Sequence, residues 1–236
     1  MSQVAIVIGA GPGLGAAAAR RFAREGFTVG LVSRKAETMA PTLHQISEAG
    51  GNARSYTADT TDGQAVATLF ASVRAELGAP DVLIYNASAF QFGGILDVSP
   101  DDFERCWKVG CHGAFLCARE VLPAMVARGR GTILLTGATA SLRGSARFSC
   151  LAVGKFGLRA LGQSMAREFG ERGVHVAHVV IDGQIDAERA RSRAPDRPAS
   201  SFLAPDAIAE TYWQLHLQPP TAWTLELDLR PSVEKF

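Results

Sequence analysis

Short apolar runs alternate with amphipathic stretches along the whole chain. Six of these runs have the length and composition of β-strands, and they cover residues 4–9, 27–33, 52–59, 81–87, 131–138 and 174–183. The first run and the last three are apolar at consecutive positions. Continuous apolar runs are typical of parallel strands that helices cover on both faces. The pattern therefore predicts a buried parallel sheet.

Between the runs, apolar residues recur with helical spacing. These stretches cover 14–25, 35–49, 63–77, 101–128 and 150–171, and a last helix at 205–217 precedes a short strand at 223–229. Strands that alternate with helices predict an α/β fold with a Rossmann-like, doubly wound parallel sheet and helices on both faces. The chain has no internal repeat, so we expect one domain over 1–236. Within it, the polar, Arg-rich and Pro-broken segment 187–201 predicts a mobile loop or lid.

Composition narrows the class of protein without naming a function. The net charge is +1, which gives no electrostatic case for nucleic acid or an anionic membrane. No uninterrupted apolar run reaches the ~18 residues of a membrane-spanning helix, and the first strand begins too early to leave room for a signal peptide. The four cysteines show no CxxC pairing, which favours reduced thiols in the cytoplasm.

A glycine cluster, GAGPGLG, follows the first strand directly. Glycines at a strand-to-helix turn let backbone N–H groups approach a pyrophosphate at the positive end of the next helix. Two spacings fit the cluster: Gly11-x-Gly13-x-x-Ala16, and Gly9-x-x-x-Gly13-x-Gly15. A flexible turn would also use glycines, but the position between a buried strand and an Ala-rich helix favours dinucleotide binding.

The second strand ends in Ser33-Arg34-Lys35, where a binder of NAD usually carries an acidic residue. A basic residue there accommodates the 2′-phosphate of NADP, so we expect NADP(H) in preference to NAD(H). The alternative is that Arg34 and Lys35 are solvated residues at the start of a helix.

Further motifs follow at matching positions. Asp59 follows the third strand, Asn86-Ala87-Ser88 follows the fourth, and Asp182-Gly183 follows the sixth. With the glycine loop and the long helix around 103–125, these residues make the chain resemble the short-chain dehydrogenase/reductase family from residue 4 to about 185. The resemblance implies homodimers or homotetramers that assemble through helices 101–128 and 150–171. It also implies a cofactor site made of Gly9, Gly13, Leu14, Gly15, Ser33, Arg34, Asp59, Thr60, Asn86, Ala87, Lys155, Gly183 and Ile185.

The family's catalytic positions are occupied here by unusual residues. In the family, a tyrosine transfers the proton, a lysine four residues later assists it, a serine positions the substrate oxygen, and an asparagine supports a proton path. Carried over, the lysine is Lys155, whereas the tyrosine, serine and asparagine positions hold Leu151, Ala138 and Gly110. A positioned general acid contributes about 10²–10⁴ in rate, so ordinary ketone reduction should be slow.

No obvious residue replaces the missing acid. Enoyl reductases of the superfamily place their tyrosine seven residues before the lysine, but here that position holds Phe148. Of the three tyrosines, Tyr56 lies in the third strand and Tyr85 directly precedes Asn86, which leaves only Tyr212 in the last helix. Thr139, just beyond the fifth strand, is the best stand-in hydroxyl. Substitute chemistry from His112, Cys111 or Cys150 is less favoured than helix packing. The arginines of 187–201, Arg189, Arg191, Arg193 and Arg197, could clamp an acidic substrate or simply be solvated.

Two functions remain open from the sequence. The first is an NADPH-dependent oxidoreductase that acts on a small organic substrate needing no tyrosine acid, such as an imine or an activated alkene. The second is a catalytically silent NADP-binding protein, a sensor or a partner subunit. We expect no metal site, because His175 and His178 are an odd number of residues apart on one strand and so face opposite sides.

Overall fold

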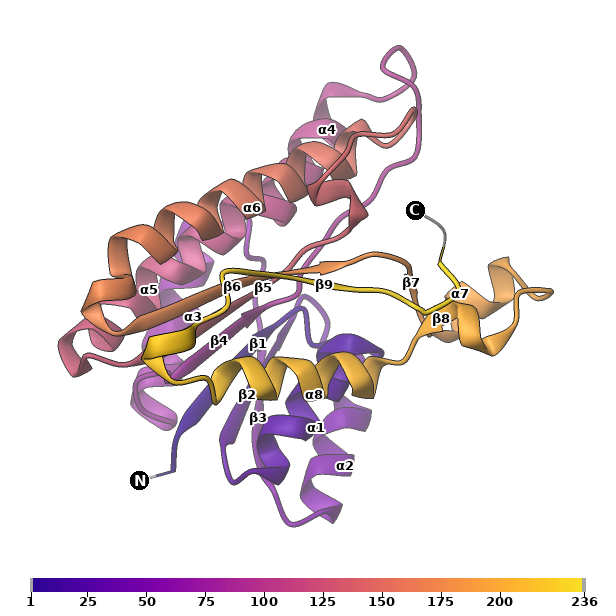
Figure 1. Ribbon diagram of the computed structural model, residues 1–236. Coiled ribbons are helices and arrows are strands. Elements are labelled where there is room, and N and C mark those ends of the chain that lie inside the picture. The colour runs from indigo at the N-terminus through magenta and orange to yellow at the C-terminus, as the bar shows by residue number, and fades with distance from the viewer. Residues whose placement is uncertain (1, 235–236) are drawn as a thin grey trace.

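A computed structural model describes residues 2–234, and its centre is a seven-stranded parallel sheet. The strand order is β3-β2-β1-β4-β5-β6-β9, with the reversal of order between β1 and β4 (Figure 1). This arrangement confirms the doubly wound α/β prediction. The strands are β1 (Val4–Ile8), β2 (Thr28–Ser33), β3 (Asn52–Thr57), β4 (Val82–Tyr85), β5 (Gly131–Thr136), β6 (Val174–Ile181) and β9 (Glu226–Leu229).

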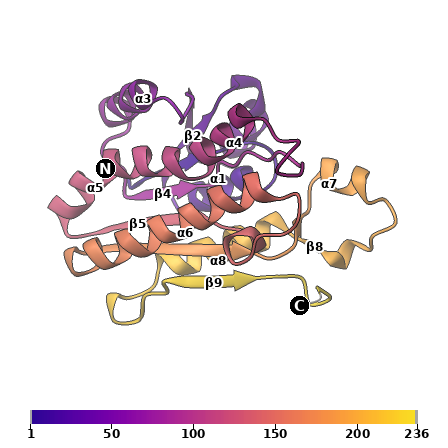
Figure 2. The same cartoon turned by 90° about the horizontal axis from the view of Figure 1, so that it is seen from above.

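Helices cover both faces of the sheet (Figure 1). One layer contains α1 (Leu14–Arg24), α2 (Ala40–Glu48) and α8 (Pro205–His216). The other contains α3 (Gly63–Glu76), α4 (Pro100–Trp107), α5 (Gly113–Arg128) and α6 (Ser149–Phe169). Figure 2, seen from above, shows α6 crossing over the sheet with β9 at the far edge.

The apolar strands bury both of their faces, as their sequences predict. Alternate residues of β1 enter different cores: Ala5 and Val7 pack on the α1 and α8 side, whereas Ile6 and Ile8 pack on the α3 and α5 side. All five residues of β1 and all eight of β6 are buried. The edge strand β3 is mostly exposed, which explains its polar sequence.

The helical run from Pro100 to Arg128 is interrupted by a π-helical turn at Lys108–His112. By length and composition this run could cross a membrane, since its most apolar window has a mean hydropathy of 1.2. The expectation concerned an uninterrupted apolar run, and this helical run carries Arg119 and Glu120 near its middle, so the two statements agree. In the structure the run packs against α3 and α6 as a helix layer of the α/β fold.

The segment 187–201 contains local structure rather than an open loop. A short helix, α7 (Glu188–Arg193), lies between β7 (Gln184–Ile185) and β8 (Phe202–Leu203), which pair in parallel. Figure 1 shows this unit projecting from the carboxyl end of the sheet. Its mobility stays a prediction.

Candidate functional site

A cleft of about 460 Å³ opens at the carboxyl ends of β1, β2 and β4. Ligands of open α/β sheets bind where the strand order reverses, and this cleft lies at that point. The register explains why its residues meet: Ile8 is paired with Tyr85, so the residues that follow both strands are neighbours. The Asn86 side chain donates to the Gly9 carbonyl at 3.0 Å. Other predicted residues that line the cleft are Ser33, Arg34, Asp59, Thr60 and Ala87.

The backbone of the glycine loop shows which of the two glycine spacings it requires. Gly9 and Gly13 have positive φ values of 82° and 98°, which L side chains rarely adopt. A Cβ on Gly15 would lie 2.3 Å from the Gly9 carbonyl oxygen, whereas a Cβ on Gly11 would meet no atom within 4 Å. The structure therefore requires glycine at positions 9, 13 and 15 and not at 11.

The amino end of α1 is open toward this loop. Its N-cap is Gly13, and no side chain of the described residues caps the helix. The first N–H groups of an uncapped helix and the helix dipole favour an anion. Leu14 and Gly15, the first two residues of α1, are buried there. The loop could therefore hold a pyrophosphate.

Charged groups at the ends of β2 and β3 lie on one side of the cleft. Asp59 accepts hydrogen bonds from the backbone N–H and the hydroxyl of Thr61, at 2.9 and 2.8 Å. These bonds, with a smaller contribution from Arg34, lower the pKa of Asp59 below its ordinary value. Arg34 is exposed and takes part in none of the salt bridges found within residues 2–234. Its guanidinium is therefore available to an anionic ligand.

Lys155 is buried in α6 and contacts the adjacent strand. It is 4% exposed, and its Nζ donates to the Thr136 carbonyl at 2.6 Å. Burial disfavours the ammonium and lowers the pKa of Lys155 to about 8. Leu151 lies one turn earlier on the same helix and offers no polar atom beside this amine.

The other two catalytic positions of the family are also apolar in the structure. Ala138 follows β5 and is half-buried, and Gly110 lies in the π-helical turn between α4 and α5. A Cβ on Gly110 would lie 3.1 Å from the Cα of Gly154 on α6. The two helices approach closely here because both residues lack side chains.

Thr139 is the stand-in hydroxyl that the sequence favours, and the structure shows how it is held. Its Oγ1 donates to the Asp182 carboxylate at 2.5 Å, and Asp182 also pairs with Arg230 at 3.2 Å. The Thr139 proton is thus directed at a carboxylate, which leaves the oxygen lone pairs to accept from a ligand. The sequence alone does not indicate Arg230, because this residue reaches Asp182 only through the pairing of β6 with β9.

None of the three tyrosines lines the cleft. Tyr85 is fully buried and donates to the Val109 carbonyl at 2.7 Å, and Tyr212 is fully buried beside the Thr136 hydroxyl at 2.8 Å. Burial raises the pKa of both phenols above the ordinary value. Tyr56 of β3 contacts Glu76 at the end of α3, and burial together with that carboxylate raises the pKa of Tyr56 to about 12.

The histidines and cysteines have packing roles in the structure. His175 and His178 lie on opposite faces of β6, as predicted: His175 stacks on Trp223, whereas His178 lies near Gly137 on the α6 side. Burial lowers the pKa of His178 to about 4. No group of three metal-binding side chains occurs in the part of the chain that the structure describes. His112 stacks on Trp107, and Cys150 is buried beside Cys106.

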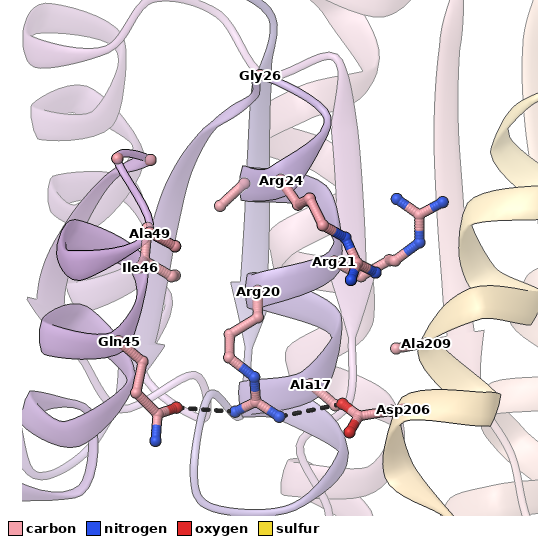
Figure 3. Close-up of a pocket in the computed structure, with 13 residues that line it drawn as sticks. Ala17, Arg20, Arg21, Arg24, Gly26, Gln45, Ile46, Ala49, Asp206 and Ala209 are labelled. Atoms are coloured by element: carbon pink, nitrogen blue, oxygen red, sulfur yellow. Dashed lines mark hydrogen bonds and ion pairs between the residues drawn. The ribbon is translucent and has the colours of Figure 1, made fainter.

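A cavity of about 540 Å³ lies elsewhere, between α1, α2 and α8. Arg20 bridges it by donating to Gln45 and to Asp206, each at 3.1 Å (Figure 3). Arg21 pairs with Glu210 at 2.6 Å. These bonds hold the three helices together across the cavity.

The remaining predicted residues lie beyond the sixth strand. Gly183 has a φ of 146°, and a Cβ there would lie 2.9 Å from the Pro231 ring. Ile185 belongs to β7. In the projecting segment, Arg191 pairs with Asp186 and Arg197 lies over the Phe202 ring, so these two guanidiniums contact the segment itself. The side chain of Arg189 lies outside the described part of the structure.

Comparison with known proteins gives one consistent result. Residues 3–198 match the short chain dehydrogenase family. Sorbitol-6-phosphate 2-dehydrogenase of Escherichia coli K12 is 31% identical over 215 residues, which cover 90% of this chain and 83% of that protein.

Solved structures agree with this match over nearly the whole chain. A short-chain dehydrogenase from Rhodopseudomonas palustris aligns with a TM-score of 0.83 at 39% identity, covering 98% of both chains. A metagenomic short-chain oxidoreductase in complex with NADP aligns with a TM-score of 0.86 at 31% identity, again over 98% of both chains.

Proposed function

Because the chain belongs to the short-chain dehydrogenase/reductase family, we propose that it is an NADPH-dependent oxidoreductase for substrates that need no tyrosine acid. The substrate class is a small organic imine or activated alkene, and a carbonyl is the poorer substrate. One observation carries this proposal. Leu151 stands one turn before Lys155, while the glycine loop, Arg34 and Asn86 keep a complete cleft.

The residues of the cleft fit NADP. The open amino end of α1 would hold the pyrophosphate, and the unpaired Arg34 would face the 2′-phosphate. Asp59 and Thr60 line the same cleft and would contact the adenine, and Asn86 and Ala87 would contact a ribose of the cofactor. A related oxidoreductase binds NADP in its solved structure, which supports this choice.

When bound, NADPH supplies the hydride, and the residues of this chain would hold the reactants. Lys155 would orient the ribose of the nicotinamide half, and Leu151 and Ala138 would line the space above it with apolar groups. An imine that solvent has protonated enters as an iminium ion, whose carbon already carries the positive charge that an acid would otherwise create, so the missing general acid costs little there. Hydride addition to an activated alkene would leave an enolate, which would take its proton from solvent water. A neutral ketone lacks these routes and should lose about 10²–10⁴ in rate.

The experiment is a cofactor titration followed by a substrate panel. NADPH binding is measured by fluorescence, and turnover is then compared for 2-methyl-1-pyrroline, 2-cyclohexenone and cyclohexanone. We expect saturable NADPH binding and faster reduction of the imine or the activated alkene than of the saturated ketone. Brisk reduction of cyclohexanone would contradict our account of Leu151, and the absence of cofactor binding would overturn the proposal.

The second candidate is a silent NADP-binding protein. The observation that favours it is the hydrogen bond from Thr139 to Asp182, since it commits the best stand-in proton to a carboxylate. NADPH binding with no turnover of any panel member would select this candidate.

We also propose that the chain forms homodimers or homotetramers in the cytoplasm, with all four cysteines reduced. The helices α4, α5 and α6 expose a group of large apolar side chains to solvent. These side chains are Phe103, Trp107, Phe115, Val153 and Phe156, each 39–42% exposed. Multi-angle light scattering should give a mass of at least two chains, and Trp107→Glu should lower it.

A further inference from the structure

Two loops beside the cleft carry a group of aromatic side chains. One loop joins β4 to α4, and the other precedes α6; both rise past α4 in Figure 1. We define the aromatic wall as the rings of Phe90, Phe92 and Phe148. Phe148 lies 5.4 Å from Phe90 and 5.3 Å from Phe92 between ring centroids, and Phe90 and Phe92 are 6.4 Å apart. These distances are those of favourable aromatic pairs.

Arg147 ties the two loops together. Its carbonyl accepts a hydrogen bond from the Gly93 N–H at 3.1 Å, and its guanidinium lies 4.5 Å from the Phe92 ring centroid. Its φ of 67° is the one positive value at a non-glycine residue within residues 2–234. A left-handed backbone at such a residue is unfavourable and persists where surrounding contacts hold it, often at ligand sites.

The wall is unusually exposed for its composition. Phe90 is 45% exposed and Phe92 is 47% exposed, although the rings already pack on one another. Large apolar surfaces left open on a folded chain often mark binding sites. The three rings themselves offer no hydrogen-bonding atom, so they favour an apolar ring over the hydroxyls of a sugar or polyol.

The wall adjoins both the cleft and the start of α6. Phe90 lines the same cleft as Gly9 and Asn86. Phe148 is the N-cap of α6, and Leu151 lies three residues later, within the first turn of that helix. Since residues three apart lie on one face of a helix, a flat apolar ring placed on the wall would have its reactive group on the side of Leu151.

We propose that the aromatic wall selects substrates that carry a planar aromatic ring next to the reducible bond. This inference rests on the proposed function and names its substrate class: an aryl-fused imine or alkene, and not a polyol or a sugar phosphate. The ring would stack on Phe92 and Phe148, while Arg147 keeps the two loops together.

The test measures binding in the absence of turnover. Protein loaded with NADP⁺ is titrated with 3,4-dihydroisoquinoline and with 2-methyl-1-pyrroline, an aromatic and an aliphatic cyclic imine, by ligand-observed NMR. The variants are Phe92→Leu, Phe148→Leu and the pair together. Leu217→Ala, which truncates a 54% exposed side chain beyond α8, is the matched control. We expect the wild type to prefer the aromatic imine, and the double variant to bind it about tenfold more weakly with little change for the aliphatic imine.

Three outcomes would overturn the proposal. The first is equal binding of both imines by the wild type. The second is an equal loss of affinity for both imines in the double variant. The third is a loss of affinity for the aromatic imine in the control as large as that in the ring variants. Light scattering on the same samples tests whether a second copy of the chain binds to the wall instead. If the double variant dissociates from an oligomer while its affinity for the imines is unchanged, the wall is an interface between copies and the proposal is wrong.

Turnover with NADPH is then measured separately for both imines. A lasting aromatic preference in binding without turnover would contradict the oxidoreductase proposal alone. Turnover without an aromatic preference would contradict the aromatic wall alone.

Discussion

The two halves of the carboxyl edge of the sheet differ in what their residues can do. The half formed by β1, β2 and α1 keeps glycines at positions that disfavour a side chain, an open helix end, and an arginine that forms no salt bridge within residues 2–234. The half formed by β5 and α6 presents Ala138 and Leu151 near a buried lysine. The first half offers groups that could contact an anionic ligand, whereas the second has apolar side chains at the positions where the family's proton-transfer residues are expected.

Groups that could hold a cofactor and groups that could move a proton therefore lie on separate elements of this fold. The glycine loop is set by the β1–α1 turn and its contact with Ala87, whereas Ala138 and Leu151 belong to the β5 end and to α6. We expect substitutions in the second half to leave the backbone of the first unchanged.

The largest effect should come from restoring the proton donors. The double variant Ala138→Ser, Leu151→Tyr should raise kcat/KM for cyclohexanone by about 10²–10⁴, because it supplies a positioned acid beside Lys155. Steady-state kinetics with NADPH measure this, and Leu151→Phe is the control that adds a ring without a hydroxyl. A double variant no faster than the wild type would show that the second half has lost its geometry as well as its groups.

Adding Gly110→Asn to this double variant should lower its stability instead of improving it. Its Cβ would meet the backbone of Gly154 at 3.1 Å, and backbone cannot rotate away as a flexible side chain can. Overpacking of this kind destabilises by about 1–3 kcal/mol. The triple variant should therefore melt at a lower temperature than the double variant, which differential scanning calorimetry can measure.

The glycine loop offers a matched pair of substitutions. Gly15→Ala places a methyl group 2.3 Å from the Gly9 carbonyl, whereas Gly11→Ala meets no atom within 4 Å. We expect Gly15→Ala to weaken NADPH binding by about a hundredfold, since a displacement near 1 Å is enough for such a loss. Gly11→Ala should change it by less than about threefold, near the 0.5 kcal/mol of an ordinary surface change. Equal losses in both variants would contradict the spacing assigned here.

Lys155 should reduce stability at neutral pH. Its pKa falls from the ordinary 10.5 to about 8 on burial, so the folded chain binds fewer protons than the unfolded chain between these values. The penalty is complete below pH 8 and disappears as the pH rises toward 10.5. Lys155→Met should therefore raise the free energy of unfolding by roughly 2–3 kcal/mol at pH 7, with a smaller gain at pH 10.

Urea unfolding at both pH values measures this gain, and Lys108→Met, at a lysine paired with Glu104 on an exposed surface, is the control. A variant less stable than the wild type at pH 7 would refute the prediction. The same variant should bind NADPH more weakly, which would identify Lys155 as a residue kept for binding at the expense of stability.

The smallest effect concerns cofactor choice. Arg34→Ser removes the guanidinium that would contact the 2′-phosphate. It should weaken NADPH binding about five- to tenfold, because an exposed charge-assisted contact contributes about 1 kcal/mol. The affinity for NADH, which lacks this phosphate, should change little. Arg54→Ser, on the same side of the sheet but paired with Glu76, is the control. An unchanged ratio of NADPH to NADH affinity would remove the basis for the preference.

The sheet and the residues that meet in the cleft could be predicted because they depend on local patterns. Continuous apolar runs indicate strands buried on both faces, and residues that follow parallel strands meet at one edge. Asn86 beside Gly9 is such a case.

The rest depends on contacts between distant segments. Arg230 beside Asp182, Tyr212 beneath Thr136 and Phe92 against Phe148 need strand or loop pairings that no local pattern contains. The exclusion of Gly11 from the glycine spacing likewise required the position of each Cβ.

The end of the chain bears on how the protein should be handled. After β9 the backbone continues at the carboxyl edge of the sheet, where Pro231 packs on Gly183 and Arg230 pairs with Asp182. The chain enters β1 at the opposite end of the strands, as Figure 1 shows. An affinity tag or fluorescent fusion therefore belongs at the amino terminus, because one attached behind Pro231 would pull on the segment that packs on Gly183 and pairs with Asp182.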